Sequence, residues 1–158
     1  DGKSTFFLIP TFVFLVVKSI IIQPAQSADL RDAIFEVRSN VFVLEQNVPK
    51  SREYDEYEDS SEHLAALVDQ HVVGTCRYRY TKNGVKLERF AVLKGYRGMK
   101  IGEHLLAHCL DVVNDEPYVY LHAQIQVVDF YAKYGFKKEG PQFEDAGIQH
   151  YKMVLVRE

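Results

Sequence analysis

The order of hydrophobic and polar residues in the first third of the chain predicts a strand followed by a helix. Residues 5–22 are mostly apolar, interrupted by one proline and one lysine, and their β-branched and aromatic content favours strand. We expect the last part, residues 18–22, to form a short strand of the main sheet. Over residues 29–44 apolar side chains recur every three or four positions, which predicts an amphipathic helix that ends before Pro49.

The middle of the chain has the alternation that is typical of strands. Residues 63–92 contain three runs rich in Val, Leu, Thr and Tyr, separated by a turn near Gln70 and by the Asn83-Gly84 pair. Asparagine and glycine tolerate a positive φ, so these runs predict an antiparallel meander with a tight hairpin. The preceding residues 50–62 are acidic and lack apolar periodicity, which indicates either a solvated loop or a flap over a cationic substrate.

The last third of the chain alternates again between helices and strands. Apolar spacing predicts a helix over residues 101–114 and a short helix over residues 127–134, ended by Gly135. Three strands accompany these helices, at residues 118–123, 136–140 and 150–156. We therefore expect an α/β (α+β) fold with a central mixed, mostly antiparallel sheet and flanking helices.

Length and the N-terminal pattern predict one domain that carries an apolar arm. A chain of 158 residues can build a single core, and no repeat or linker divides it. We expect residues 18–158 to form this domain and residues 1–17 to form a β-arm against a partner subunit, which predicts a homodimer. A membrane anchor is the alternative for the arm, and the charge of Lys18 near its end argues against it.

Composition and charge restrict the partners that the protein can bind. The net charge of -3 excludes the global positive field on which non-specific nucleic-acid binding depends, so any anion must be held locally. The two cysteines have neither metal-ligand nor redox-motif spacing and cannot form a disulfide framework. We therefore expect no metal, no nucleic acid and a reducing, cytoplasmic compartment.

Residues 96–106, YRGMKIGEHLL, place an arginine, two glycines and a lysine directly before an apolar helix. A helix N-terminus presents unpaired N–H groups and a partial positive charge, so it can bind an anion. Arg97 and the nearby lysines add the charge that a diphosphate requires. Such a turn is also common without a ligand, and these residues alone leave both interpretations open.

The context of this turn resembles the acetyl-CoA motif of the GNAT superfamily of N-acetyltransferases, Gln/Arg-x-x-Gly-x-Gly/Ala after a strand ending in Ala-Val. The segment FAVLKGYRGMKIG matches it with Phe90, Ala91, Val92, Arg97 and Gly102. The resemblance implies that these residues bind acetyl-CoA together with their neighbours Gly98, Met99, Lys100 and Ile101. Because Lys100 replaces the middle glycine of the motif, we expect it either to adopt a strained backbone or to shift the loop.

The segment AQIQVVDFYAKYGF is similar to a second motif of the same superfamily. Gln124 stands where an asparagine usually contacts the pantetheine arm, and Phe130 and Lys133 match further cofactor positions. Tyr131 corresponds to the tyrosine that donates a proton to the departing CoA thiolate, with a purely structural core aromatic as the alternative. The resemblance covers residues 20–156 and implies two neighbouring strands that splay apart around the acetyl group.

Acetyl transfer also needs a base and groups that hold the acceptor amine. Glu88 is the candidate base, because strict alternation places it on the strand face of Phe90 and Val92. The alternative for Glu88 is an ion pair with Arg77 or Arg79. These two arginines share a face, and they either bind a carboxylate or phosphate of the acceptor or only border the sheet.

Glu45, at the end of the first helix, is a further candidate for the acceptor site. His150 is another, with a hydrogen-bonded structural histidine as the alternative. The strand LERFAV is similar to a strand of glucosamine-phosphate acetyltransferases, with Glu88 in the matching position. We therefore expect acetyl transfer from acetyl-CoA to a small amine, best represented by glucosamine 6-phosphate. A protein or peptide acetyltransferase and a non-catalytic acyl-CoA-binding module are the alternatives.

Overall fold

A computed structural model describes residues 18–157, so the predicted arm at residues 1–17 lies outside the described part of the chain. The elements in chain order are β1 (Ile20–Pro24), α1 (Ala28–Arg38), the π-helix η1 (Ser39–Glu45), α2 (Lys50–Glu53), β2 (Glu62–Val68), β3 (His71–Thr81), β4 (Gly84–Val92), the 3₁₀ turn η2 (Lys94–Tyr96), α3 (Ile101–Val112), β5 (Val119–Gln124), the 3₁₀ turn η3 (Ile125–Val127), α4 (Val128–Ala132), β6 (Phe136–Lys138), β7 (Phe143–Asp145) and β8 (Ile148–Leu155).

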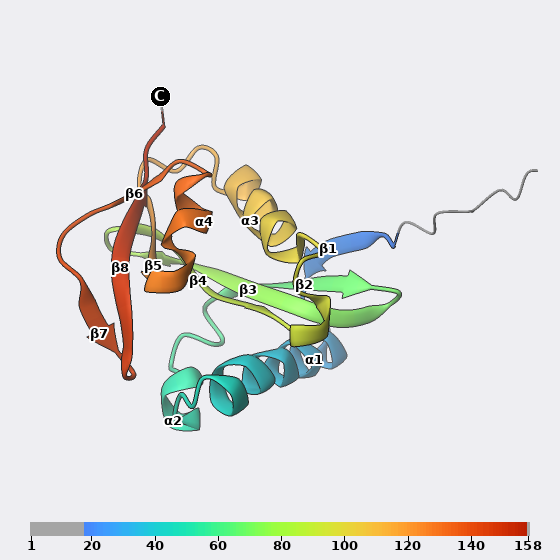
Figure 1. Cartoon of the computed structure of the whole chain (residues 1–158). Coiled ribbons are helices and arrows are strands. Elements are labelled where there is room, and N and C mark those ends of the chain that lie inside the picture. The colour runs from blue at the N-terminus through green and yellow to red at the C-terminus, as the bar shows by residue number, and fades with distance from the viewer. Residues whose placement is uncertain (1–17, 158) are drawn as a thin grey trace, which may run out of the picture.

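The strands form one eight-stranded sheet in the order β1-β2-β3-β4-β5-β8-β6, with β7 paired to β8 (Figure 1). Every neighbouring pair is antiparallel except β4 and β5, which run parallel. The predicted mixed, mostly antiparallel sheet is confirmed, and so is the meander, which consists of β2, β3 and β4. Helices α1 and α2 lie on one face of the sheet, and α3 and α4 lie on the other (Figure 1).

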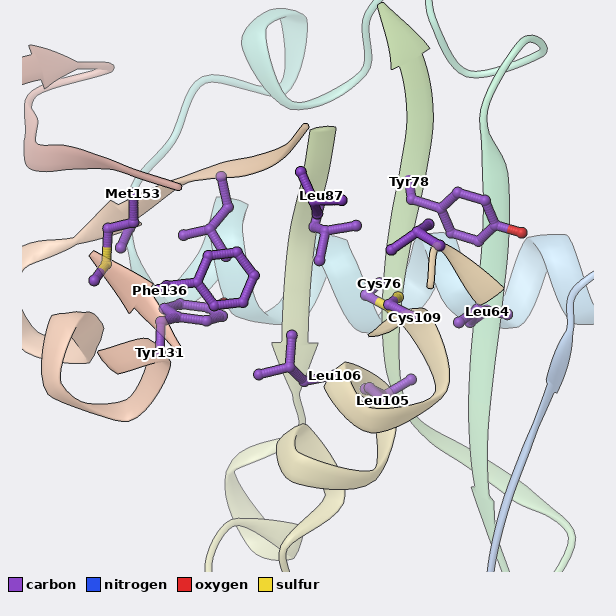
Figure 2. Close-up of a cluster of buried hydrophobic side chains, with 14 of the residues drawn as sticks. Leu64, Cys76, Tyr78, Leu87, Leu105, Leu106, Cys109, Tyr131, Phe136 and Met153 are labelled. Atoms are coloured by element: carbon purple, nitrogen blue, oxygen red, sulfur yellow. The ribbon is translucent and has the colours of Figure 1, made fainter. Parts of the chain in front are cut away.

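The main core lies between the sheet and α3. Leu105 and Leu106 of α3 pack against strand residues such as Leu64 and Leu87, and Tyr131 and Phe136 extend the cluster toward β8 (Figure 2). A smaller core lies under α1 and η1 on the opposite face; it consists of Val37, Val41, Phe42, Val48 and Ala91. Both faces of the sheet are therefore covered at its central strands β3 and β4.

Gly74 brings the start of α3 directly against β3. A Cβ atom at this position would lie 2.8 Å from Cγ2 of Ile101 and 3.3 Å from the carbonyl oxygen of Ala91, so only glycine allows this approach. At the end of α4, Gly135 has a φ of 91°, as predicted for a residue that stops a helix in the left-handed region.

The predicted single helix over residues 29–44 changes its hydrogen bonding after Arg38. From Ser39 onward it is a π-helix, in which the Gln46 N–H donates to the carbonyl oxygen of Val41, five residues back. The wider turns of the π-helix keep Val41 buried. They rotate Leu44 off the apolar face, so that this residue is 70% exposed. The prediction that Leu44 belongs to the buried face is therefore wrong.

Candidate functional site

The central feature of the site is the point at which β4 and β5 separate. The two strands pair only from Val85 and Val119 to Leu87 and Leu121, although β4 continues to Val92 and β5 to Gln124. A cleft of about 750 Å³ opens between their free ends. This matches the splayed pair of strands that the family resemblance implies.

The cleft brings most of the predicted site residues together. Those that line it are Glu45, Arg79, Glu88, Phe90, Ala91, Val92, Arg97, Gly102, Gln124, Phe130, Tyr131 and His150. Those outside its lining are Arg77, Gly98, Met99, Lys100, Ile101 and Lys133. Of this second group, Gly98 to Ile101 still form the turn at the N-terminus of α3.

The turn before α3 leads into the N-terminus of this helix, where backbone N–H groups can bind an anion. Lys100 is the N-cap residue of this 12-residue helix and adopts a left-handed conformation, with φ 62° and ψ 24°. The lysine therefore takes the strained backbone anticipated for a residue in place of glycine. At Gly102 an added Cβ would meet the Phe130 ring at 3.8 Å, so the first turn of α3 lies beside α4. The residues present fit the diphosphate and pantetheine of acetyl-CoA.

Replacing Lys100 with glycine is expected to increase the free energy of unfolding by about 0.5–1 kcal/mol, because glycine adopts the left-handed conformation without steric strain. Urea denaturation of the two proteins measures this difference. Lys100→Ala is the control, since alanine also removes the lysine but keeps the strain. A glycine variant that is no more stable than the alanine variant would show that the backbone of Lys100 is not strained.

Arg97 lies at the edge of the cleft and is held by Glu45. Its Nη2 lies 2.9 and 3.1 Å from the two carboxylate oxygens of Glu45, and its Nε donates to the carbonyl oxygen of Val92 at 3.0 Å. Glu45, predicted to point toward the acceptor, is thus paired with an arginine of the cofactor loop. Its carboxylate contributes no free charge to the acceptor side of the cleft.

A β-bulge at Arg89 changes the face on which Glu88 lies. Thr75 of β3 pairs with Ala91 of β4, and Arg77 pairs with Glu88. The two residues on β3 are two positions apart in the sequence, whereas their partners on β4 are three positions apart. The extra residue, Arg89, has a φ of 61°. The prediction that Glu88 shares a face with Phe90 and Val92 is therefore wrong, because it assumed uninterrupted alternation.

Glu88 is surrounded by positive charge instead. Its carboxylate lies within ion-pair distance of Arg77, Arg79 and Lys86, at 3.1, 2.5 and 3.4 Å respectively. Burial alone would raise the pKa of Glu88, but the charges of Lys86 and Arg77 and the hydrogen bond from Arg79 together lower it. The geometry supports the ion-pair interpretation, since a carboxylate with a lowered pKa is a weak base.

Arg77 and Arg79 do reach the same carboxylate, but their environments differ. Arg77 is 0% exposed, and its guanidinium also pairs with Asp55 at 2.6 Å and with Glu58 at 3.0 Å. Arg79 lines the cleft and stacks on the ring of Tyr57, 3.9 Å from the ring centroid. Of these two arginines, Arg79 lines the cleft and Arg77 does not.

The acidic residues 50–62 are not simply a solvated loop. Glu53, Asp55 and Glu58 turn inward and form ion pairs with Arg38, Arg77 and Arg89. Although burial opposes ionisation, the hydrogen bonds and charge of Arg77 lower the pKa of Asp55 to about 2. The sequence could not show this role, because the arginines come from α1, β3 and β4.

His150 and His122, which both line the cleft, flank Phe143. The rings of His150 and Phe143 are stacked with centroids 5.6 Å apart, and His122 meets Phe143 edge-on at 5.0 Å. Nδ1 of His150 lies 2.7 Å from the carbonyl oxygen of Ile148, which satisfies one ring nitrogen. Burial and the charge of Lys86 lower the pKa of His122 to about 4, so its imidazole is neutral at physiological pH.

Tyr131 lies at the inner end of the cleft, where α4 meets the sheet. Its ring makes edge-on contacts with Phe90, Phe130 and Phe136, at centroid distances of 5.8, 5.0 and 6.0 Å. Burial raises the pKa of the Tyr131 phenol well above its usual value, so the hydroxyl stays protonated. Within residues 18–157 this hydroxyl forms no hydrogen bond, although the residue lines the cleft. The ring of Tyr131 is thus part of the core, while its hydroxyl has no partner among the described residues and could donate a proton. The structure is compatible with both predicted roles.

The cleft residues that the sequence did not single out include Gln46, Lys86, Arg89 and His122. Alternation along β5 could have placed His122 on the face of Gln124, two residues away. No local signal indicates the bulge at Arg89 or the position of Gln46 after a π-helix.

Two negative findings apply to the described residues. Between residues 18 and 157 no helix is long and apolar enough to cross a membrane. In the same part of the chain, no group of three or more His, Cys, Asp or Glu side chains converges to hold a metal ion.

Comparisons with known proteins identify the family of this chain. Residues 28–157 match the family model described as an acetyltransferase (GNAT) domain. The chain is 40% identical over 128 residues to the uncharacterized N-acetyltransferase YjcF of Bacillus subtilis, a match that covers 79% of this chain and 91% of that protein.

Solved structures share the fold at lower identity. Escherichia coli ElaA superposes with a TM-score of 0.74 at 24% identity, covering 89% of this chain and all of that chain. The PaiA N-acetyltransferase of Thermoplasma acidophilum, in complex with coenzyme A, has a TM-score of 0.66 at 20% identity and covers 87% of this chain and 98% of that chain. The splayed strands, the turn before α3 and the matched domain together place this chain in the GNAT superfamily, as an acetyl-CoA-dependent acetyltransferase.

Proposed function

We propose that this enzyme acetylates the primary amine of a small molecule that also carries an anionic group. An amino-sugar phosphate such as glucosamine 6-phosphate is the best candidate for the acceptor. The observation that carries the proposal is an excess of positive charge in the ion-pair network beside the cleft.

This network joins more cationic side chains than carboxylates. Its five cations outnumber its four carboxylates by one. The cations are Arg38, Arg77, Arg79, Lys86 and Arg89, and the carboxylates are Glu53, Asp55, Glu58 and Glu88. Three of the cations, Arg79, Lys86 and Arg89, line the cleft together with three of the carboxylates, Glu53, Asp55 and Glu88, so the unpaired positive charge belongs to the network as a whole. An anionic group on the acceptor would balance this charge and accept hydrogen bonds from a guanidinium.

The chain's own residues supply the remaining functions on the two sides of the cleft. Acetyl-CoA, when bound, supplies the activated acetyl group. Tyr131 provides a protonated phenol for the leaving thiolate, and the neutral imidazole of His122 can accept a hydrogen bond from the acceptor amine. Glu88, with its lowered pKa, holds Arg79 and Lys86 toward the acceptor rather than removing the amine proton.

A panel of amines tests the proposal through release of the CoA thiol. We expect glucosamine 6-phosphate to be acetylated with a higher kcat/KM than unphosphorylated glucosamine, polyamines or lysine-containing peptides. Arg79→Met should raise the KM for the sugar phosphate about 10-fold and leave that for glucosamine nearly unchanged, because a charge-assisted hydrogen bond is lost. Lys138→Met is the control, since this lysine of β6 lies over Tyr151 of β8 and does not line the cleft.

Other outcomes would select the alternatives. Faster acetylation of lysine peptides would contradict the proposal and favour a protein acetyltransferase. That reading has less support, because three carboxylates of the acidic segment are already paired with arginines. Binding of CoA without thiol release from any amine would favour a non-catalytic module.

We also propose that the enzyme works as a homodimer in the reducing environment of the cytoplasm. The compartment is supported by the two buried thiols, Cys76 and Cys109, which remain free with their sulfur atoms 3.5 Å apart. The homodimer rests on the apolar segment at residues 1–17, which lies outside the described residues.

A further inference from the structure

The end of the π-helix η1 contacts both arms of the splayed strands. Glu45 pairs with Arg97, which follows β4, and the adjacent Gln46 pairs with Gln124, the last residue of β5. These contacts join residues 52 and 78 positions apart in the sequence. Two consecutive residues at the end of η1 therefore contact the two strand ends that border the cleft.

The backbone around Gln46 is arranged to project this side chain into the cleft. The N–H of Gln46 closes a π-turn to Val41, and the next residue, Asn47, adopts a left-handed conformation with a φ of 57°. After this turn, the Val48 N–H donates to the carbonyl oxygen of Phe42 at 2.9 Å, which anchors the chain again. π-turns are rare and occur often at functional sites, so this geometry indicates a role for the residues it displays.

The hydrogen bonds of Gln124 leave one donor free. Its Oε1 accepts from Nε2 of Gln126 at 2.6 Å and from Nε2 of Gln46 at 3.4 Å, which occupies both lone pairs. Its Nε2 donates to Oε1 of Gln46 at 2.9 Å. Among the described residues no second acceptor contacts this Nε2. The carboxamide is thus held in one orientation, with a single N–H available to a carbonyl oxygen.

We propose that Gln46 is a positioning residue for acetyl-CoA binding. It fixes the carboxamide of Gln124 so that the free N–H faces an amide carbonyl of the pantetheine arm. Without Gln46 only the hydrogen bond from Gln126 orients the carboxamide, which is then freer to rotate and present its oxygen to the same carbonyl. This role concerns the cofactor arm, and it does not depend on which amine the enzyme acetylates.

Calorimetric titration of the full chain with CoA, without any acceptor, tests the role of Gln46. We expect Gln46→Ala to raise the Kd for CoA about 5-fold, the effect of losing one oriented hydrogen bond. Gln46→Glu should raise it less, because a carboxylate oxygen still accepts the 2.9 Å bond from Gln124. Leu44→Ala, an exposed neighbour outside the cleft, is the control and should leave the Kd unchanged.

A double-mutant cycle separates positioning from a direct or a general structural effect. If Gln46 acts through Gln124, Gln124→Ala will raise the Kd, and adding Gln46→Ala will raise it no further. Thermal denaturation should give the same Tm for Gln46→Ala and the parent protein. An unchanged Kd in Gln46→Ala, or effects of the two substitutions that multiply, would overturn the proposal.

Discussion

Replacing Tyr131 with phenylalanine is expected to lower kcat about 100-fold, the contribution typical of a positioned general acid. The substitution removes only a hydroxyl that forms no hydrogen bond within residues 18–157, while the aromatic contacts with Phe90 and Phe136 remain. The Kd for CoA and the Tm should therefore change little. The rate of CoA thiol release at saturating acetyl-CoA and acceptor measures kcat, and calorimetry measures the Kd for CoA.

Tyr134→Phe is the matched control for this prediction. Tyr134 lies one turn further along, packs on Phe130 and does not line the cleft, so the loss of its hydroxyl should leave kcat unchanged. Because burial raises the pKa of Tyr131, its phenol stays protonated at pH values up to about 10, and its ionisation should not lower the rate in that range. Equal kcat values for Tyr131→Phe and the parent enzyme would exclude Tyr131 as the acid.

Replacing Arg77 with methionine is expected to lower the free energy of unfolding by about 3–5 kcal/mol. Arg77 is fully buried, and its removal would leave the carboxylates of Asp55, Glu58 and Glu88 without their shared partner. Removing one partner of a buried ion pair is strongly destabilising, and methionine cannot donate the two hydrogen bonds that Arg77 makes to Asp55. Urea denaturation followed by circular dichroism measures the change.

Two variants keep this prediction testable if Arg77→Met does not fold. Arg77→Lys retains the charge but not the bidentate contact with Asp55, so its loss of stability should be smaller than that of the methionine variant. Arg52→Met breaks an exposed ion pair with Asp145, and we expect a change of at most about 1 kcal/mol. Equal effects of Arg77→Met and Arg52→Met would show that the buried network does not stabilise the fold.

The dependence of stability on pH gives a further check on Arg77. The pKa of Asp55 falls from 3.8 to about 2 in the folded protein, so this carboxylate contributes stability above its unfolded pKa. That contribution is lost as the pH falls from about 3.8 toward 2. In Arg77→Lys the slope of stability against pH across this window should be shallower, because the main partner of Asp55 is weakened.

Local periodicity was sufficient for most of the secondary structure. The meander β2-β3-β4, helix α3 and the stop at Gly135 were all predicted correctly, since each depends on side chains within one short segment. The turn before α3 was located for the same reason, because Arg97 to Gly102 are contiguous, and its role in cofactor binding stays a prediction. Predictions from periodicity failed at the π-helix before Gln46 and at the bulge at Arg89. In each case an extra residue in one element changed the direction of the side chains that follow it.

By itself, the sequence determined most of the strands and helices and the GNAT resemblance, because both are recorded in the spacing of residues along the chain. The tertiary structure alone decided how the charged side chains pair. Arg77 is buried and paired with Asp55 outside the cleft, Glu45 lines the cleft but is paired with Arg97, and Arg79 lines the cleft beside Tyr57. Ion pairing depends on distances in space between segments, and the packing of α1, the acidic segment and the sheet sets those distances.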